Sequence, residues 1–270
     1  VCSSDLNNVI ELTGDNSNFT VSNCYLDGYS TTSTSTSYAI IYEWAGSANM
    51  TNNITVLNNT LKDGSYGIYT FGENYSSFSD SLSVEGNEFI DFDYRAINFY
   101  YWRYNVIHNN KITSKSSASS GCSGVHGYYS QRTDVTNNII KVTGTSHSHG
   151  LYLYNNYGIS SDRNLIANNM ITKPNNSTSS SNYDLIYYNN YTDIVNNSWY
   201  GLYGYNSTTY GLVWLNNGTS VQFSNNSIYN GNTGGYCFRV VGTPTEKNNN
   251  YYNRSTTRRR YPASGGTGNI

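Results

Sequence analysis

One short phrase repeats along almost the whole chain. An apolar residue is followed by any residue, an Asn-Asn pair, any residue and a second apolar residue, as in the central copy from Val135 to Ile140. The second Asn of the pair, or its equivalent, falls at Asn59, Asn87, Asn110, Asn138, Asn169, Asn197, Asn226 and Asn250, so that successive copies are 28, 23, 28, 31, 28, 29 and 24 residues apart. A period of this length is typical of a solenoid, in which each unit buries its apolar side against its neighbours.

The residues around the pair predict strands. Apolar residues stand three positions before and two positions after the second Asn, and the polar residues between them follow the two-residue period of a strand. These pairs are Val56/Leu61, Val84/Phe89, Ile107/Ile112, Val135/Ile140, Ile166/Ile171, Ile194/Trp199 and Phe223/Ile228, with an earlier copy in which Cys24 takes the Asn position. We therefore expect them to face the core.

The Asn-Asn pair itself is predicted to be a corner between two strands. Asn tolerates the left-handed backbone conformation that a sharp bend requires. Stacked copies place equal positions about 4.8 Å apart, so the amide of one Asn can donate to and accept from the copies above and below it. A column of Asn should then form a hydrogen-bonded ladder.

This pattern, followed in each copy by a Gly-led strand such as Gly150 to Tyr154, resembles the right-handed parallel β-helix repeat family, the pectin-lyase-like solenoids. The resemblance covers roughly residues 7 to 253. It implies an all-β, right-handed parallel β-helix (a single-stranded solenoid) of about nine rungs with an Asn ladder, about 40 Å long at the usual strand spacing. The family contains lyases, hydrolases, epimerases, phage tailspikes and non-catalytic surface proteins, so the fold does not imply one function.

The two ends of the chain depart from the repeat. Residues 1–6, Val-Cys-Ser-Ser-Asp-Leu, match one translated frame of a common sequencing-adapter oligonucleotide, and we interpret them as a non-native stretch of a truncated environmental sequence. A natural start within a longer protein is the alternative, and either interpretation makes the chain a fragment. Residues 7–253 form the predicted β-helix, and 254–270 an irregular basic and Gly-rich tail. Two insertions, 30–52 and 173–183, are predicted to project as loops.

Composition limits the partners. The net charge of -2 and a charged fraction of 12% argue against nucleic acid, which requires a concentrated basic face. No apolar run approaches the roughly 20 residues of a membrane-spanning helix, so we expect no membrane insertion. A chain rich in Tyr, with 29 of them, and in polar uncharged residues is typical of an extracellular or cell-surface solenoid.

The Gly-led strand carries the candidate binding surface. Alignment on its Gly predicts Ile68, Ile97, Val125, Leu151, Leu185, Leu212 and Phe238 as inward residues. The outward positions are then Tyr69/Phe71, Asn98/Tyr100, His126/Tyr128, Tyr152/Tyr154, Ile186/Tyr188 and Val213/Leu215. Seven rings of this column are predicted to bind carbohydrate: Tyr69, Phe71, Tyr100, Tyr128, Tyr152, Tyr154 and Tyr188. Packing on an exposed sheet is the alternative, since Tyr is a common strand residue.

Candidate catalytic residues are few. The outward positions hold no pair of carboxylates, which a glycosidase requires. A lyase requires a group that neutralises a uronate carboxylate and a base that removes the neighbouring proton. His126 with Tyr152, and Arg95 or Arg132 near them, is the one such group that the sequence suggests. His147 and His149 alone make an incomplete metal site.

Two functions follow as hypotheses. The preferred one is a secreted or cell-surface module, structural or adhesive, with an aromatic face that binds a polysaccharide or surface glycan. The alternative is a polysaccharide lyase or glycoside hydrolase that acts on an acidic polysaccharide. No cofactor is expected, and Ca²⁺ enters only under the lyase alternative.

Overall fold

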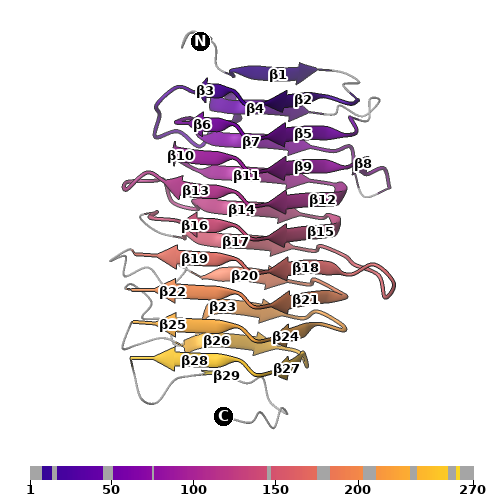
Figure 1. The fold of residues 1–270 in the computed structure, drawn as a ribbon, viewed down its shortest axis with the longest axis vertical. Coiled ribbons are helices and arrows are strands. Elements are labelled where there is room, and N and C mark those ends of the chain that lie inside the picture. Colours follow the sequence, from indigo (N-terminus) through magenta and orange to yellow (C-terminus); the bar gives the residue numbers. More distant parts are fainter. Residues whose placement is uncertain are drawn as a thin grey trace.

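The computed structural model describes residues 8–13, 17–44, 51–74, 76–144, 147–174, 183–202, 211–231, 236–254 and 260–261. The chain is a right-handed parallel β-helix in which each coil adds one strand to each of three sheets (Figure 1). In this view the strands of sheets B and C lie in front and run to the left, and the strands of sheet A lie behind and run to the right. Since the chain descends from the N-terminus at the top, this path is right-handed. The predicted fold class is confirmed.

Sheet A has ten parallel strands. They are β1 (Ile10–Thr13), β4 (Ala39–Trp44), β7 (Tyr66–Phe71), β11 (Arg95–Tyr100), β14 (Ser123–Tyr128), β17 (His149–Tyr154), β20 (Asp184–Tyr187), β23 (Gly211–Asn216), β26 (Tyr236–Val241) and β29 (Arg260–Tyr261). This sheet contains the Gly-led strands of the repeat. Its last strand, β29, falls in the segment 254–270 that was predicted to be irregular.

Sheets B and C lie on either side of the Asn-Asn corner. Sheet B consists of β2 (Thr20–Ser22), β5 (Ile54–Leu57), β9 (Leu82–Glu85), β12 (Trp102–His108), β15 (Gln131–Thr136), β18 (Asn164–Ala167), β21 (Thr192–Val195), β24 (Gln222–Ser224) and β27 (Thr245–Lys247), with β8 (Ser79–Asp80) paired to β12. Sheet C consists of β3 (Tyr25–Asp27), β6 (Thr60–Lys62), β10 (Glu88–Phe92), β13 (Lys111–Ser114), β16 (Ile139–Lys141), β19 (Met170–Lys173), β22 (Ser198–Gly201), β25 (Ser227–Asn230) and β28 (Asn250–Asn253).

The apolar residues that flank the corner fill the interior. Every member of the pairs from Val56/Leu61 to Phe223/Ile228 is at most 2% exposed. They pack in one continuous core with the inward residues of sheet A. Burying them stabilises the solenoid by roughly 25 cal/mol per Å² of apolar surface, and most of that burial occurs between neighbouring coils.

The Asn ladder runs from Asn59 to Asn249. Each ladder side chain accepts from the backbone N–H of the preceding ladder Asn at 2.8 to 3.0 Å. Its oxygen also accepts from the preceding side-chain amide at 2.9 to 3.1 Å. Each amide donates in addition to a backbone carbonyl of sheet B at 2.7 to 2.9 Å, as Asn138 does to Ile107. The ladder amides are therefore buried and well bonded.

The two Asn of a pair have different roles. The first, for example Asn137 with φ 57°, has the left-handed conformation and an exposed side chain, and Gly86 takes this position in one coil. The second supplies the ladder amide. The prediction that Asn250 is the last ladder residue is wrong, because Asn249 accepts from Asn226 and Asn250 begins β28. At the other end, Cys24 occupies the slot and its N–H donates to Asn59 Oδ1.

The first insertion is more structured than predicted. Of residues 30–52, the segment Thr36–Tyr38 forms the 3₁₀ helix η1, and Ala39–Trp44 is strand β4 of sheet A. The prediction of a projecting loop over the whole segment is therefore wrong, because it overlooked a strand. The second insertion, 173–183, begins at the end of β19, and its residues 175–182 lie outside the described part of the chain.

A buried ion pair lies in the interior of the β-helix, at the base of this second insertion. Lys173 Nζ lies 2.5 Å from Asp184 Oδ1, and the two side chains are 5% and 0% exposed. Asp184 also accepts from Trp199 Nε1 at 2.7 Å and from the Gly150 N–H at 2.6 Å. Burial lowers the pKa of Lys173, and the neighbouring carboxylate opposes that shift. A charged pair in a core is tolerated only when its remaining bonds are satisfied, as they are for this carboxylate.

Among the described residues, no helix has the length and apolar character needed to cross a membrane.

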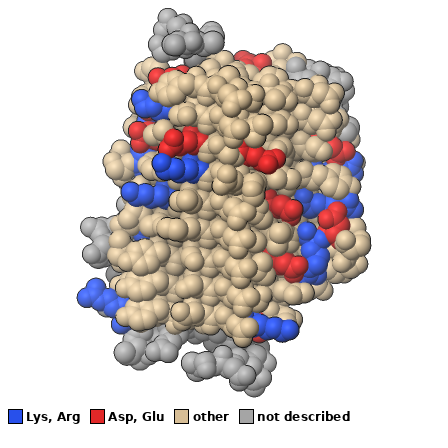
Figure 2. Space-filling model, viewed as in Figure 1, with Lys and Arg blue, Asp and Glu red and all other residues tan. Residues whose placement is uncertain are grey.

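On the side shown in Figure 2, which carries sheets B and C, acidic and basic side chains are interspersed at the edges of a broad uncharged area. Three ion pairs lie at the start of sheet B: Arg103–Asp80, Arg132–Asp162 and Arg163–Asp193. This side has no large patch of one sign.

The ladder gives the first prediction. Replacing Asn138 by Leu removes the acceptor of Asn110 and leaves the Ile107 carbonyl without the amide that now donates to it. Unsatisfied buried groups cost about 1 to 3 kcal/mol each, so we expect the free energy of unfolding to fall by about 3 kcal/mol or more in a urea titration.

The matched control is Asn137→Gly in the same corner. Its exposed side chain is not part of the ladder, and Gly adopts the left-handed conformation readily, so we expect a change below about 1 kcal/mol. Equal urea midpoints for Asn138→Leu and the parent protein would contradict a stabilising ladder.

Candidate functional site

The outward face of sheet A carries two columns of side chains held in register. The first contains Tyr42, Tyr69, Asn98, His126 and Tyr152 and continues to Leu185, Trp214 and Arg239. The second contains Trp44, Phe71, Tyr100, Tyr128, Tyr154 and Tyr187. The predicted outward positions from Tyr69 to Tyr154 are therefore correct.

The predicted register is wrong in the last copies. Tyr187, not Tyr188, pairs with Tyr154, and Tyr188 lies in the corner beyond the strand with φ 51°. Leu185 is outward and pairs with Tyr152, whereas Ile186 is inward. Likewise Val213, predicted outward, is inward, since it pairs with Phe238, whereas Leu212 is in the core as predicted. The shift in β20 arises because Asp184 occupies the inward position of this strand. An alignment based on apolar residues places the next residue, Leu185, in that position instead.

Three of the five neighbouring ring pairs in the second column are stacked, whereas Tyr100 is tilted against both Phe71 and Tyr128. Trp44 stacks on Phe71 with a centroid distance of 4.5 Å, and Tyr154 stacks on Tyr128 at 4.6 Å and on Tyr187 at 4.8 Å. The interplanar angles of these three pairs are 10°, 10° and 4°, so the ring planes lie across the helix axis. Both faces of Tyr154 are thus covered by other rings. The stacked part of the column therefore offers ring edges and phenol hydroxyls, and not flat ring faces.

These phenols are neutral hydrogen-bonding groups. Burial raises the pKa of Tyr69 and of Tyr128, so neither ionises near neutral pH. Tyr69 is only 8% exposed and packs against Tyr66 and Tyr42, whereas Trp44 at the end of the column is 47% exposed. A phenol hydroxyl both donates and accepts, which suits the hydroxyl groups of a sugar.

Arg95 lies in the middle of this aromatic surface. It precedes the first column on β11, and its position in the neighbouring strands is taken by Tyr66 and Ser123. Its guanidinium donates to Asn98 Oδ1 at 2.8 Å, to the Tyr100 hydroxyl at 3.2 Å and to the Tyr94 hydroxyl at 3.0 Å. Its central carbon lies 4.5 Å from the centre of the Tyr94 ring. In the described part of the chain no carboxylate is within ion-pair distance of this cation.

Three polar atoms beside Arg95 have no hydrogen-bond partner. They are Arg95 Nε, Asn98 Nδ2 and His126 Nδ1. Asn98 and His126 are direct neighbours in the register of β11 and β14. Buried polar atoms without partners are rare in proteins and often indicate a ligand or an ordered water. The cluster is therefore short of hydrogen-bond partners and has an excess positive charge.

The structure brings the predicted catalytic group together and buries part of it. The His126 and Tyr152 rings stack at 4.4 Å with an interplanar angle of 1°, and Tyr100 lies 6.0 Å from His126. His126 is 5% exposed, and burial together with the charge of Arg95 holds its pKa well below the ordinary value. Arg132 is not part of the group, because it contacts Asp162 and Tyr104 at the start of sheet B. A neutral, covered imidazole has limited access to a substrate.

The two candidate metal-binding His residues differ in exposure. His147 is exposed in the segment before β17, whereas His149 is 6% exposed and its Nδ1–H donates to the carbonyl of Tyr183. Burial, with the charge of Lys173, lowers the pKa of His149 to about 3. The described residues contain no group of three or more His, Cys, Asp or Glu placed to hold a metal ion.

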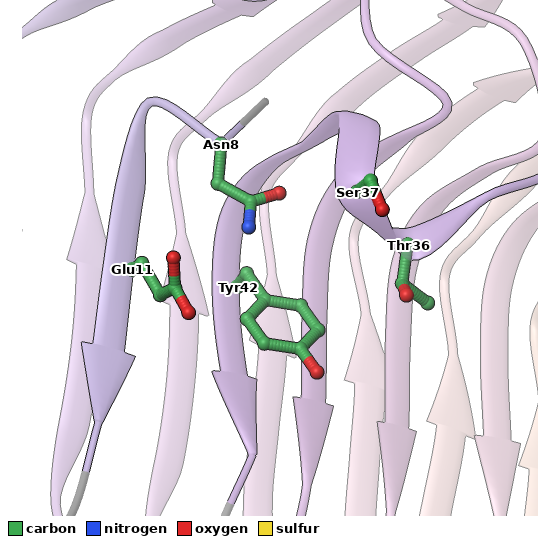
Figure 3. Close-up of a pocket in the computed structure, with 5 residues that line it drawn as sticks. All are labelled: Asn8, Glu11, Thr36, Ser37 and Tyr42. Carbon is green, nitrogen blue, oxygen red and sulfur yellow. The ribbon is translucent and has the colours of Figure 1, made fainter. Parts of the chain in front are cut away.

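Two hollows at the N-terminal end adjoin this face. Figure 3 shows the first, of about 270 Å³, where Asn8 and Glu11 come from β1 and its approach, Tyr42 from β4, and Thr36 and Ser37 from η1. The second, of about 490 Å³, lies between the loop after β3 and the loop after β13. The first insertion contributes to both hollows, and sequence reasoning did not identify either of them as a site. A run of Ser and Thr with a Tyr at its start was the available signal.

No protein-family model matches the chain, and no curated protein matches it. Among solved structures, the crystal structure of an alginate lyase from Paenibacillus sp. str. FPU-7 matches 84% of this chain and 86% of that chain. The sequence identity is 13% and the TM-score is 0.41. At this distance no residue role and no activity carries over to this chain.

The buried imidazoles give a prediction about pH. Unfolded His has a pKa of about 6.5, and the folded value of about 3 for His149 means that lowering the pH protonates the unfolded chain first. Stability should be complete above about pH 6.5 and should fall progressively as the pH drops toward the folded pKa. NMR should show the neutral imidazole signals of His149 unchanged from neutral pH to about pH 4.5, and those of His126 unchanged through the unfolded pKa of about 6.5. A titration midpoint near the unfolded value would contradict the burial.

Proposed function

We propose that the chain is a non-catalytic glycan-binding module that holds an acidic polysaccharide along sheet A. The observation that carries this proposal is Arg95, a largely covered guanidinium that is bonded to neutral oxygens and lies beside unpaired polar atoms of Asn98 and His126. A cation placed in this way interacts favourably with a carboxylate or sulfate, because an added negative charge supplies the missing partner.

The surroundings favour a sugar polymer over a small anion. Ring edges recur along the axis at centroid distances between 4.5 and 5.3 Å from Trp44 to Tyr187. A ligand with hydroxyl groups at a regular repeat can bond to several of these edges at once, and each bond adds to its neighbours. An extended glycan that lies parallel to the axis has this character. A secreted or cell-surface location, within a longer protein, is part of the same proposal.

The test is retention on immobilised acidic polysaccharide. Arg95→Gln removes the charge and keeps a side chain that can bond to its neighbours, and we expect its affinity for polyuronate to fall about tenfold or more, since charge-assisted bonds contribute roughly 1.5 to 3 kcal/mol. Binding by the parent protein should weaken as salt is added, because the charged contact is screened.

Arg103→Gln is the matched control, because it removes an equal charge that is paired with Asp80 at the start of sheet B. We expect this variant to bind like the parent. An equal loss of affinity in both variants would mean that binding depends only on net charge, which would contradict a specific role of Arg95. Unchanged retention of Arg95→Gln on polyuronate, at an unchanged melting temperature, would refute the proposed site.

A second candidate function, a polysaccharide lyase, is favoured by the contact between His126 and Tyr152 beside Arg95. In such a reaction Arg95 would neutralise the uronate carboxylate and the neutral His126 imidazole would remove the adjacent proton, while the bond to the departing sugar breaks and the Tyr152 hydroxyl gives its proton to the leaving oxygen. The measurement is ultraviolet absorbance of unsaturated products from polyuronates, with and without Ca²⁺. We expect none from the parent protein. Product formation that His126→Ala abolishes would replace the binding function by the lyase.

A further inference from the structure

The larger hollow lies beside the binding face, at the corner that joins sheet C to sheet A. Its lining residues are Tyr29, Ser30, Thr31, Thr32, Lys115 and Ser117. At about 490 Å³ it falls within the usual size range of small-ligand sites. Four of its six lining residues carry hydroxyls on short side chains and one is an aromatic ring. This lining suits a ligand rich in hydroxyl groups.

The loop that forms one wall is fixed in place. The hydroxyls of Thr31, Ser33 and Ser35 each accept from the backbone N–H two residues further on. Three contacts tie the loop to the next wall. Lys115 Nζ donates to Ser30 Oγ at 3.1 Å and to the Thr31 carbonyl at 2.9 Å, and Ser119 Oγ donates to the Thr32 carbonyl at 3.1 Å. A ligand therefore meets a loop that needs little further ordering, which reduces the entropy lost on binding.

Tyr29 differs from the rings of sheet A. It stacks on Tyr38 with a centroid distance of 5.4 Å, and that is its one ring contact within the described residues. Its side chain remains 51% exposed. By contrast, Tyr154 has a ring against each face. Tyr29 can thus offer the electron-rich face that the C–H groups of a pyranose prefer.

We infer that this hollow binds one pyranose unit at the end of a glycan chain, with Tyr29 as the ring platform and the Ser and Thr side chains as hydroxyl partners. The inference rests on the proposed function, since the chain would continue from the hollow onto sheet A. Tyr94, which bonds to Arg95, packs over Gly121 in the same loop region that supplies Ser117. The two surfaces are therefore neighbours.

The hollow should not select for charge. Lys115 is the one cation in its lining, and it already donates to Ser30 Oγ and to the Thr31 carbonyl and lies 3.6 Å from Asp63. Its charge is therefore largely balanced within the protein. Recognition here depends on hydroxyl groups and ring stacking, whereas charge recognition depends on Arg95.

The experiment compares two tetrasaccharides by isothermal titration calorimetry, cellotetraose as the neutral probe and tetragalacturonate as the acidic one. We expect cellotetraose to bind with little effect of salt, and tetragalacturonate to bind with an additional contribution from Arg95 that weakens as salt is added. Tyr29→Ala should weaken both about tenfold, and Tyr29→Phe, which keeps the ring, should bind like the parent. Tyr25→Ala is the matched control, because Tyr25 is 57% exposed on sheet C and does not line the hollow.

The outcomes separate the two proposals. Absence of tetrasaccharide binding, or binding that Tyr29→Ala leaves unchanged, overturns the hollow as a sugar site. Binding of the acidic probe alone, lost in Arg95→Gln and retained in Tyr29→Ala, also overturns it while the function of sheet A stands. Loss in Tyr29→Ala with polyuronate retention unchanged in Arg95→Gln supports the hollow and refutes the function proposed for sheet A.

Discussion

The buried Asn ladder is the interaction on which the rest of the structure depends. Each ladder amide bonds to the coil before it and the coil after it, so one column fixes the height and register of every neighbouring strand. An amide buried without these partners would be costly, which makes the corner intolerant of a shift. Because the corner is fixed, the apolar residues on both sides of it stack in columns, and so do the outward residues of sheet A.

The same register that aligns the aromatic side chains also determines what they can do. Rings held one coil apart stack on each other, which stabilises the fold but removes their faces from solvent. The outer surface is then a row of phenol edges, with Arg95 among them as an unbalanced charge. A ring outside the columns, Tyr29, keeps a more exposed face and lies next to a hollow.

The core also holds polar groups that a simple apolar pattern does not predict. Asp184 and Lys173 replace apolar residues at the base of the second insertion, and Trp199 and Gly150 satisfy the carboxylate. Asn105, Thr133, Asn164 and Thr192 form a further short series of hydrogen bonds at the start of sheet B. Such groups cost desolvation energy, and the stacked backbone of the solenoid supplies partners at fixed spacing.

The sequence by itself determined the fold, the ladder from Asn59 to Asn226 and the outward column from Tyr69 to Tyr154, because a repeating pattern of Asn and apolar residues has one stacked solution. It misplaced Tyr188, Leu185 and the ladder end at Asn250, since an inward Asp184 and an atypical last coil break the pattern that alignment relies on. Ring orientation, the burial of His126 and the hollow beside Tyr29 were decided by tertiary structure alone. They depend on distances between side chains of different coils, and a period along the chain carries no information about those distances.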